Sequence, residues 1–170
     1  MRLYSGKIPA IAQDIAKALD AAEAIEAPSS KEVAADLEAV LKEYLRNERE
    51  ITDEAKARME RKGLSYSLLS KVRAQVSAER SFPAPDEFLP YILEQLIEML
   101  FHSANVEEVF ADDTELRKLL APILRKHLEV EETLDREIRA RLKHLQEGTA
   151  AFEIEYQKLV DQMKRKQHLA

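Results

Sequence analysis

The residue types that could bind a metal or move protons are plentiful, but their spacing is not that of a metal site. The sequence contains 4 His and 32 Asp and Glu residues. Di-iron helical bundles use Glu-x-x-His on facing helices, and no histidine of this sequence follows a Glu at that spacing. Glu98 lies four residues before His102, which is the spacing of an ordinary surface pair on a helix. We therefore predict no metal ion and no cofactor.

The candidate nucleophiles also lack the surroundings of a catalytic site. The chain has no Cys, which excludes thiolate nucleophiles, disulfides and thiolate zinc ligands. Ser65 and Ser67 follow Gly63, but Gly-Leu-Ser-Tyr-Ser differs from the Gly-x-Ser-x-Gly elbow of α/β-hydrolases. Asp112-Asp113 stands at an expected helix start, where carboxylates stabilise the helix dipole. We predict no catalytic residue and a protein that is not an enzyme.

The composition excludes several other classes of protein. The 170 residues are 45% hydrophobic and 34% charged, so the chain can build a core beneath a very polar surface. With only 3 Gly, the sequence lacks the glycine-rich turns of phosphate-binding loops, Rossmann domains and β-barrels. The net charge of −6 provides no general attraction to nucleic acid or to an anionic membrane. Residues 1–7 lack the apolar run of a signal peptide, and we expect a cytoplasmic protein that does not enter a membrane.

The elements that position these residues are predicted to be helices. Apolar residues recur at intervals of three and four along most of the chain, as on one face of a helix. Ser29 with Glu32, and Asp112 with Glu115, have the spacing of a capping box at a helix start. Polar residues at 47–50 weaken the pattern. Candidate starts of further helices are Thr52 in the first half and either Thr133 or Asp135 in the second. The sequence therefore predicts an all-α fold.

The apolar pattern also occurs twice. The series Leu37-x-x-Val40-Leu41-x-x-Tyr44-Leu45 aligns with Leu120-x-x-Ile123-Leu124-x-x-His127-Leu128. Pro83 and Pro85 interrupt the chain between the two copies, because proline cannot continue a helix. We predict two tandem repeats of about four helices each, at residues 1–80 and 86–170, joined by a linker at 81–85.

Two local predictions follow from this alignment. The short segments Ala24–Pro28 and Val106–Phe110, which join the first two helices of each repeat, have sequences that could pair as a minimal two-strand ribbon. Pro122 lies inside an expected helix of the second repeat. Because interior proline removes a backbone hydrogen bond, we expect a kink or a break near Leu119-Leu120.

Three parts of the chain carry a family likeness: Met1-Arg2-Leu3, the run from Val109-Phe110 through Leu124, Leu128, Val130-Glu131 and Leu134-Asp135, and Gln146-Glu147-Gly148 with Tyr156. They resemble the bacterial family known as domain of unknown function number 507. The resemblance covers essentially the whole chain and is greatest from Val106 to Lys166, whereas the turn at 63–66 departs from the second copy. It implies a helical bacterial protein and brings no activity, cofactor or catalytic residue.

The segment Phe88–Phe101 is the first candidate for a binding surface. Its apolar residues cover more than half of a helical circumference, which is wider than the stripe of an ordinary surface helix. Such a helix is either a central core element between the repeats or an interface for a protein partner or a second copy. The interface residues would be Phe88, Ile92, Leu93, Leu96, Leu100 and Phe101.

The uneven distribution of charge along the chain indicates a second candidate for a binding surface. Residues 61–80 contain five bases and one acid, whereas residues 81–116 contain nine acids and neither Lys nor Arg. These charges could be solvated helix faces that pair within the molecule, or they could form a docking surface. Our alternative function is therefore nucleic-acid binding, through Lys62, Lys71, Arg73, Lys164, Arg165 and Lys166.

Overall fold

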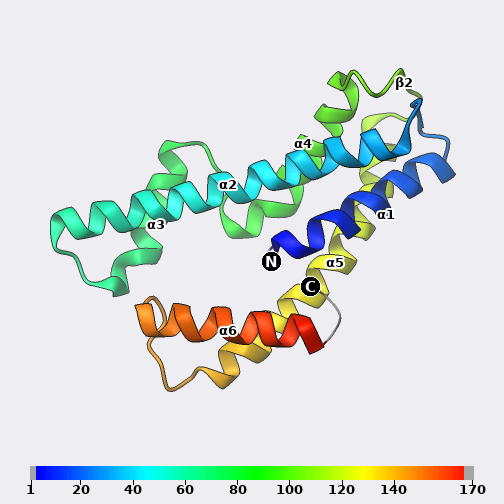
Figure 1. Cartoon of the computed structure of the whole chain (residues 1–170). Coiled ribbons are helices and arrows are strands. Elements are labelled where there is room, and N and C mark those ends of the chain that lie inside the picture. The colour runs from blue at the N-terminus through cyan, green and yellow to red at the C-terminus, as the bar shows by residue number, and fades with distance from the viewer. Residues whose placement is uncertain (1–2, 167–170) are drawn as a thin grey trace.

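The computed structural model describes residues 3–166, except for the side chains of residues 130–132 and 164. Within these residues the chain forms six α-helices and a two-strand ribbon (Figure 1). The elements are α1 (Ile8–Ala21), β1 (Ile25–Glu26), α2 (Ser30–Lys62), α3 (Leu69–Glu79), α4 (Phe88–His102), β2 (Glu108–Val109), α5 (Asp113–Arg141) and α6 (Ala150–Lys166). The all-α prediction is confirmed.

The ribbon joins the two connections that the sequence singled out. Strands β1 and β2 are antiparallel, with Ile25 opposite Val109 and Glu26 opposite Glu108. The backbone N–H of Glu107 donates to the carbonyl of Glu26 at 2.8 Å, beside the paired residues. The predicted ribbon is confirmed, and it ties the α1–α2 connection to the α4–α5 connection.

The number of helices in each half was predicted wrongly. Helix α2 is continuous over 33 residues, and α5 over 29, so each half has three α-helices instead of four. The hydroxyl of Thr52 does not cap a new helix but donates back to the carbonyl of Glu48 at 3.1 Å. Polar residues at 47–50 do not stop the helix, because Ile51 and Met59 continue its buried face against α3.

Helix α5 runs through Pro122, so the break that we expected near Leu119-Leu120 is absent, and the kink stays a prediction. Pro122 and Lys118 are both exposed. The Lys118 carbonyl, which loses its helical hydrogen bond to proline, therefore lies on the solvent side of the helix, where water can bind it. On the opposite face Leu120 and Leu124 are fully buried, and this packing holds the helix together across the proline.

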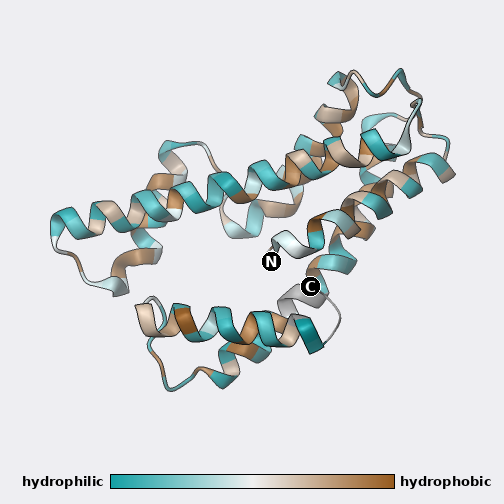
Figure 2. Ribbon diagram, viewed as in Figure 1, coloured by the Kyte–Doolittle hydropathy of each residue, from teal (hydrophilic) through white to brown (hydrophobic). Residues whose placement is uncertain are grey.

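The largest hydrophobic core lies where α1 and α4 pack against the N-terminal parts of α2 and α5. Ile15, Leu41, Leu96 and Leu124 are among its fully buried side chains, one from each helix. The apolar residues of these helices are brown in Figure 2. The two halves of the chain therefore share this core across the segment 81–85.

Two smaller cores lie farther along the long helices. Helix α3 packs on the C-terminal part of α2 around Ile51 and Val76. Helix α6 packs on the C-terminal part of α5 around Ile138 and Val160. Both halves thus have the order helix, short strand, long helix, helix. The sequence duplication and the division at 81–85 stay predictions.

Candidate partner-binding groove

Helix α4 contributes mainly to the core of the molecule. Of the six residues that the sequence suggested for an interface, five are at most 6% exposed: Phe88, Ile92, Leu93, Leu96 and Leu100. Phe101, at the C-terminal end of the helix, is 52% exposed. The wide apolar surface of α4 is explained by its position, because the helix packs in the core shared by α2 and α5.

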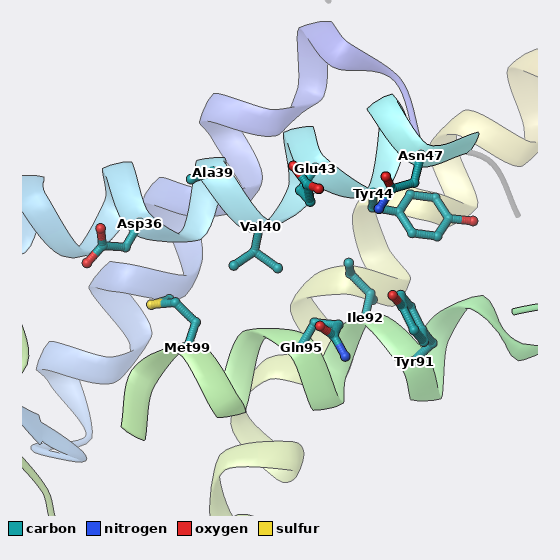
Figure 3. A pocket seen from close by; sticks show the side chains of 10 residues that line it. All are labelled: Asp36, Ala39, Val40, Glu43, Tyr44, Asn47, Tyr91, Ile92, Gln95 and Met99. Atoms are coloured by element: carbon teal, nitrogen blue, oxygen red, sulfur yellow. The ribbon is translucent and has the colours of Figure 1, made fainter. Parts of the chain in front are cut away.

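An open groove lies between α2 and α4 and has a volume of about 320 Å³ (Figure 3). We call it the α2–α4 groove. It is lined by Asp36, Ala39, Val40, Glu43, Tyr44 and Asn47 from α2 and by Tyr91, Ile92, Gln95 and Met99 from α4. Residues 36–47 of α2 extend over about 16 Å at 1.5 Å per residue, so the groove matches about three turns of a helix.

The two helices run antiparallel along the groove. At one end, the Asp36 carboxylate accepts hydrogen bonds from Ser103 at 2.5 Å and from Asn105 at 2.9 Å. At the other end, the ring of Tyr44 lies 6.2 Å from the ring of Tyr91. These contacts fix the two helices at both ends of the groove.

Aromatic rings close the Tyr44 end. The Tyr44 ring stacks on Phe82 at 5.0 Å and meets the edge of Phe88 at 4.7 Å. Phe82 belongs to the segment between α3 and α4, so this connection is packed against α2. Burial, followed by the nearby charge of Glu48, raises the pKa of the Tyr44 hydroxyl, which therefore stays neutral.

The walls of the groove are half-buried apolar side chains, and its charges are negative. Val40 points from α2 towards α4, and Met99 lies on α4 nearer the Asp36 end (Figure 3). Among the described lining residues, Asp36 and Glu43 are acidic and none is basic. Glu43 pairs with Arg46 on the exposed side of α2, a surface contact that contributes little to stability and can exchange partners.

The residues of the nucleic-acid alternative do not form one patch in the described part of the chain. Lys62 and Lys71 are exposed near the turn between α2 and α3. Arg73 lies across from Glu48, with Nη2 at 3.7 Å from the carboxylate. Arg165 and Lys166 are exposed at the C-terminal end of α6, the end farther from the α5–α6 turn (Figure 1). The side chain of Lys164 lies outside the described parts.

Several neighbouring bases are neutralised by acids of the same molecule. Arg58 bridges Glu54 and Glu79, at 2.5 and 2.6 Å. Arg80 pairs with Glu54 at 2.6 Å and with Glu50 at 3.3 Å. The charges of residues 61–80 are thus partly used to hold α3 on α2.

The structure contains no obvious metal centre or membrane-crossing helix in its described residues. Among residues 3–166, leaving aside the side chains of 130–132 and 164, no three His, Asp or Glu residues are grouped so that they could hold a metal ion. Nor does any helix of that part of the chain have the length and apolarity needed to cross a membrane.

The chain matches one family of proteins over almost its whole length. A family model described as protein of unknown function (DUF507) matches residues 1–169. The chain belongs to the DUF507 family. No curated protein matches it. The DUF507 match extends over both helices of the α2–α4 groove, and the description of the family names no activity.

Proposed function

We propose that this DUF507 protein is a non-catalytic interaction protein that binds a basic, amphipathic segment of a partner protein in the α2–α4 groove. The observation that carries this proposal is the combination of apolar walls with two carboxylates and no base among the described lining residues. A partner segment with apolar side chains on one face and Lys or Arg at its edges complements this lining.

The position of the acids supports a basic partner. Glu94 and Glu98 are exposed on α4, next to the groove residues of that helix. They belong to residues 81–116, which contain no Lys or Arg. Charges on the rim of an interface mainly steer the approach of a partner, so we expect the association to weaken as salt is added.

The apolar walls support a helical occupant. Val40, Tyr91 and Met99 are each half-buried and line the groove. Methionine has a flexible and polarizable side chain, which adapts to different apolar partners. This groove takes over the docking role that the sequence suggested for the whole of Phe88–Phe101, because most of that surface is core.

Peptide binding mapped by NMR tests the proposal. The probe is a short synthetic helix with Leu on one face and Lys on the other, and the control peptide has the same composition in an order without helical periodicity. We expect the amphipathic peptide to shift the backbone signals of residues 36–47 and 91–99, and the control peptide to bind more weakly. Equal binding of the two peptides, or shifts confined to other helices, would contradict the proposal.

A second copy of the chain is an alternative occupant, and sedimentation distinguishes it. We expect the protein to sediment as a monomer, and we expect substitutions in the groove not to change this. If the protein forms a dimer and Gln95→Lys dissociates it, the occupant of the groove is a second copy of the chain and not a partner segment.

We do not propose nucleic-acid binding, because the candidate bases lie apart and one of them faces Glu48. A bacterial origin and a cytoplasmic location stay predictions.

A further inference from the structure

A second cavity, of about 420 Å³, lies on the other side of Tyr44 from the groove, between α2, α3 and the segment that leads to α4. We call it the Arg73 cavity. Its apolar lining consists of Leu3, Ile51, Ala74, Ala78, Phe82, Pro83, Ala84 and Pro85, and its polar lining of Tyr44, Glu48, Ser70, Arg73, Ser77 and Glu87. This volume falls in the range of natural small-molecule sites, about 300–1,000 Å³.

The polar groups of this cavity are not satisfied by one another. Nη2 of Arg73 lies 3.7 Å from the Glu48 carboxylate, which is too far for a hydrogen bond. The buried Nε of Arg73 has no acceptor among the described atoms. The Tyr44 hydroxyl, kept neutral by a raised pKa, is a further donor on the same wall. The gap of 3.7 Å leaves Arg73 and Glu48 without a direct hydrogen bond, so an occupant that brings both an acceptor and a donor can bridge them.

The charges of this cavity do not favour a charged occupant. Arg73 and Glu48 face each other across a short gap, so their opposite charges largely cancel for a molecule that lies beside both. Glu87, the other acid, already accepts a hydrogen bond from the Ala84 N–H at 3.2 Å. A neutral group that presents an acceptor beside a donor can bridge Arg73 and Glu48 without a buried unpaired charge.

We propose that the Arg73 cavity binds a small, uncharged, flat molecule that carries a carbonyl next to an N–H, as in a lactam, a primary amide or the edge of a nucleobase. The carbonyl accepts from Arg73, and the N–H donates to Glu48. The flat body packs against Ile51, Phe82 and Pro83, which supply the apolar walls. This site is separate from the α2–α4 groove and does not depend on its function.

Three related compounds test this chemistry by NMR titration. The probe is 2-quinolinone, a flat neutral lactam. N-methyl-2-quinolinone keeps the carbonyl but lacks the N–H, and quinoline-2-carboxylate is a flat anion of similar size. We expect 2-quinolinone to shift the Nε–Hε signal of Arg73. We expect the two analogues to bind at least about tenfold more weakly than 2-quinolinone. An unmoved Arg73 signal at saturating probe, or equal binding of the N-methyl compound, would overturn the proposal.

Variants of the two bridging residues complete the test. We expect Arg73→Lys and Glu48→Gln each to weaken 2-quinolinone binding by about tenfold, whereas Glu60→Gln at the exposed end of α2 leaves it unchanged. If either bridging variant fails to fold by circular dichroism, Ala74→Leu provides a second route, because its larger side chain fills the cavity from α3. Undiminished binding to folded Ala74→Leu would place the ligand elsewhere and contradict the assignment.

Discussion

The hydroxyls of Tyr4 and Tyr156 lie 2.8 Å apart, although 152 positions separate the two residues in the chain. Tyr156 uses its own proton to donate to Asp135 on α5, so Tyr4 is the donor to Tyr156. Asp135 also accepts from Nε of Arg139 at 2.9 Å. The N-terminal segment is thereby attached to the core formed by α5 and α6.

Removing these hydroxyls tests the attachment. We expect Tyr4→Phe to lower the free energy of unfolding by about 1 kcal/mol, because one buried hydrogen bond is lost. Tyr156→Phe should cost about 1–3 kcal/mol, because Asp135 also loses a donor. Urea denaturation measures both, and Tyr66→Phe is the control, since Tyr66 is 51% exposed. Equal stability of Tyr156→Phe and the unmodified protein would show that the attachment contributes nothing.

Acid should loosen the contact between α2 and α3. Hydrogen bonds from Arg58 lower the pKa of Glu54 and of Glu79 below their ordinary value of 4.5, with a further hydrogen bond from Arg80 to Glu54. Because the folded-state pKa is depressed, this stabilisation is complete above the unfolded pKa and is lost as the pH falls through the folded pKa.

Melting temperatures measured from about pH 6 down to about pH 3 check this prediction. We expect Arg58→Gln to flatten the acid-side decrease, since neither carboxylate then keeps its Arg58 hydrogen bond. Lys42→Gln is the control, because Lys42 pairs with Glu38 in an exposed contact within α2. An Arg58→Gln profile parallel to that of the unmodified protein would exclude this network as a source of acid sensitivity.

The role of α4 in the core leads to a paired prediction on stability. Leu96→Ala should destabilise the protein by about 2–5 kcal/mol, because it leaves a cavity in a fully buried position. Phe101→Ala, on the same helix at a residue that is 52% exposed, should change stability by about 0.5 kcal/mol at most. Denaturant titration measures both, and similar values for the two variants would contradict the burial of this helix.

Pro122 offers a test of helix continuity in α5. Pro122→Ala restores a backbone donor in the middle of the helix, and we expect stabilisation by about 1–3 kcal/mol. Pro90→Ala is the matched control, because Pro90 lies in the first turn of α4, where proline is tolerated and little gain is expected. A destabilised Pro122→Ala protein would show that the proline fits a local backbone shape that alanine does not support.

The sequence predicted the fold class well, because helical periodicity and capping boxes are local signals. Asp112 and Glu115 form the expected reciprocal capping box, with hydrogen bonds of 2.8 and 2.9 Å. The lengths of the helices were less predictable. Whether the polar residues at 47–50 end a helix depends on the tertiary contacts of Ile51 and Met59 with α3, which no local pattern contains.

The groove could be predicted only in part. The apolar excess of Phe88–Phe101 pointed to the correct helix, but not to the face that remains accessible. Tyr91, Gln95 and Met99 recur at four-residue intervals on one face of α4. This row of side chains, in which the Gln95 amide is the one polar group besides the tyrosine hydroxyl, is the sequence pattern that could have indicated the accessible face. The residues of α2 that form the opposite wall could not be predicted in this way, because they meet α4 only through the antiparallel packing of two helices that are distant in sequence.

The most direct test of the account is the affinity of the basic amphipathic peptide for charge-reversed variants, measured by isothermal titration calorimetry. Glu43→Lys in the groove and Glu60→Lys at the far, exposed end of α2 change the net charge of the protein equally. We predict that Glu43→Lys weakens binding by about tenfold, or about 1.4 kcal/mol, and that Glu60→Lys has little effect. Equal weakening by the two variants would show that the peptide responds only to net charge, and would contradict binding in the α2–α4 groove.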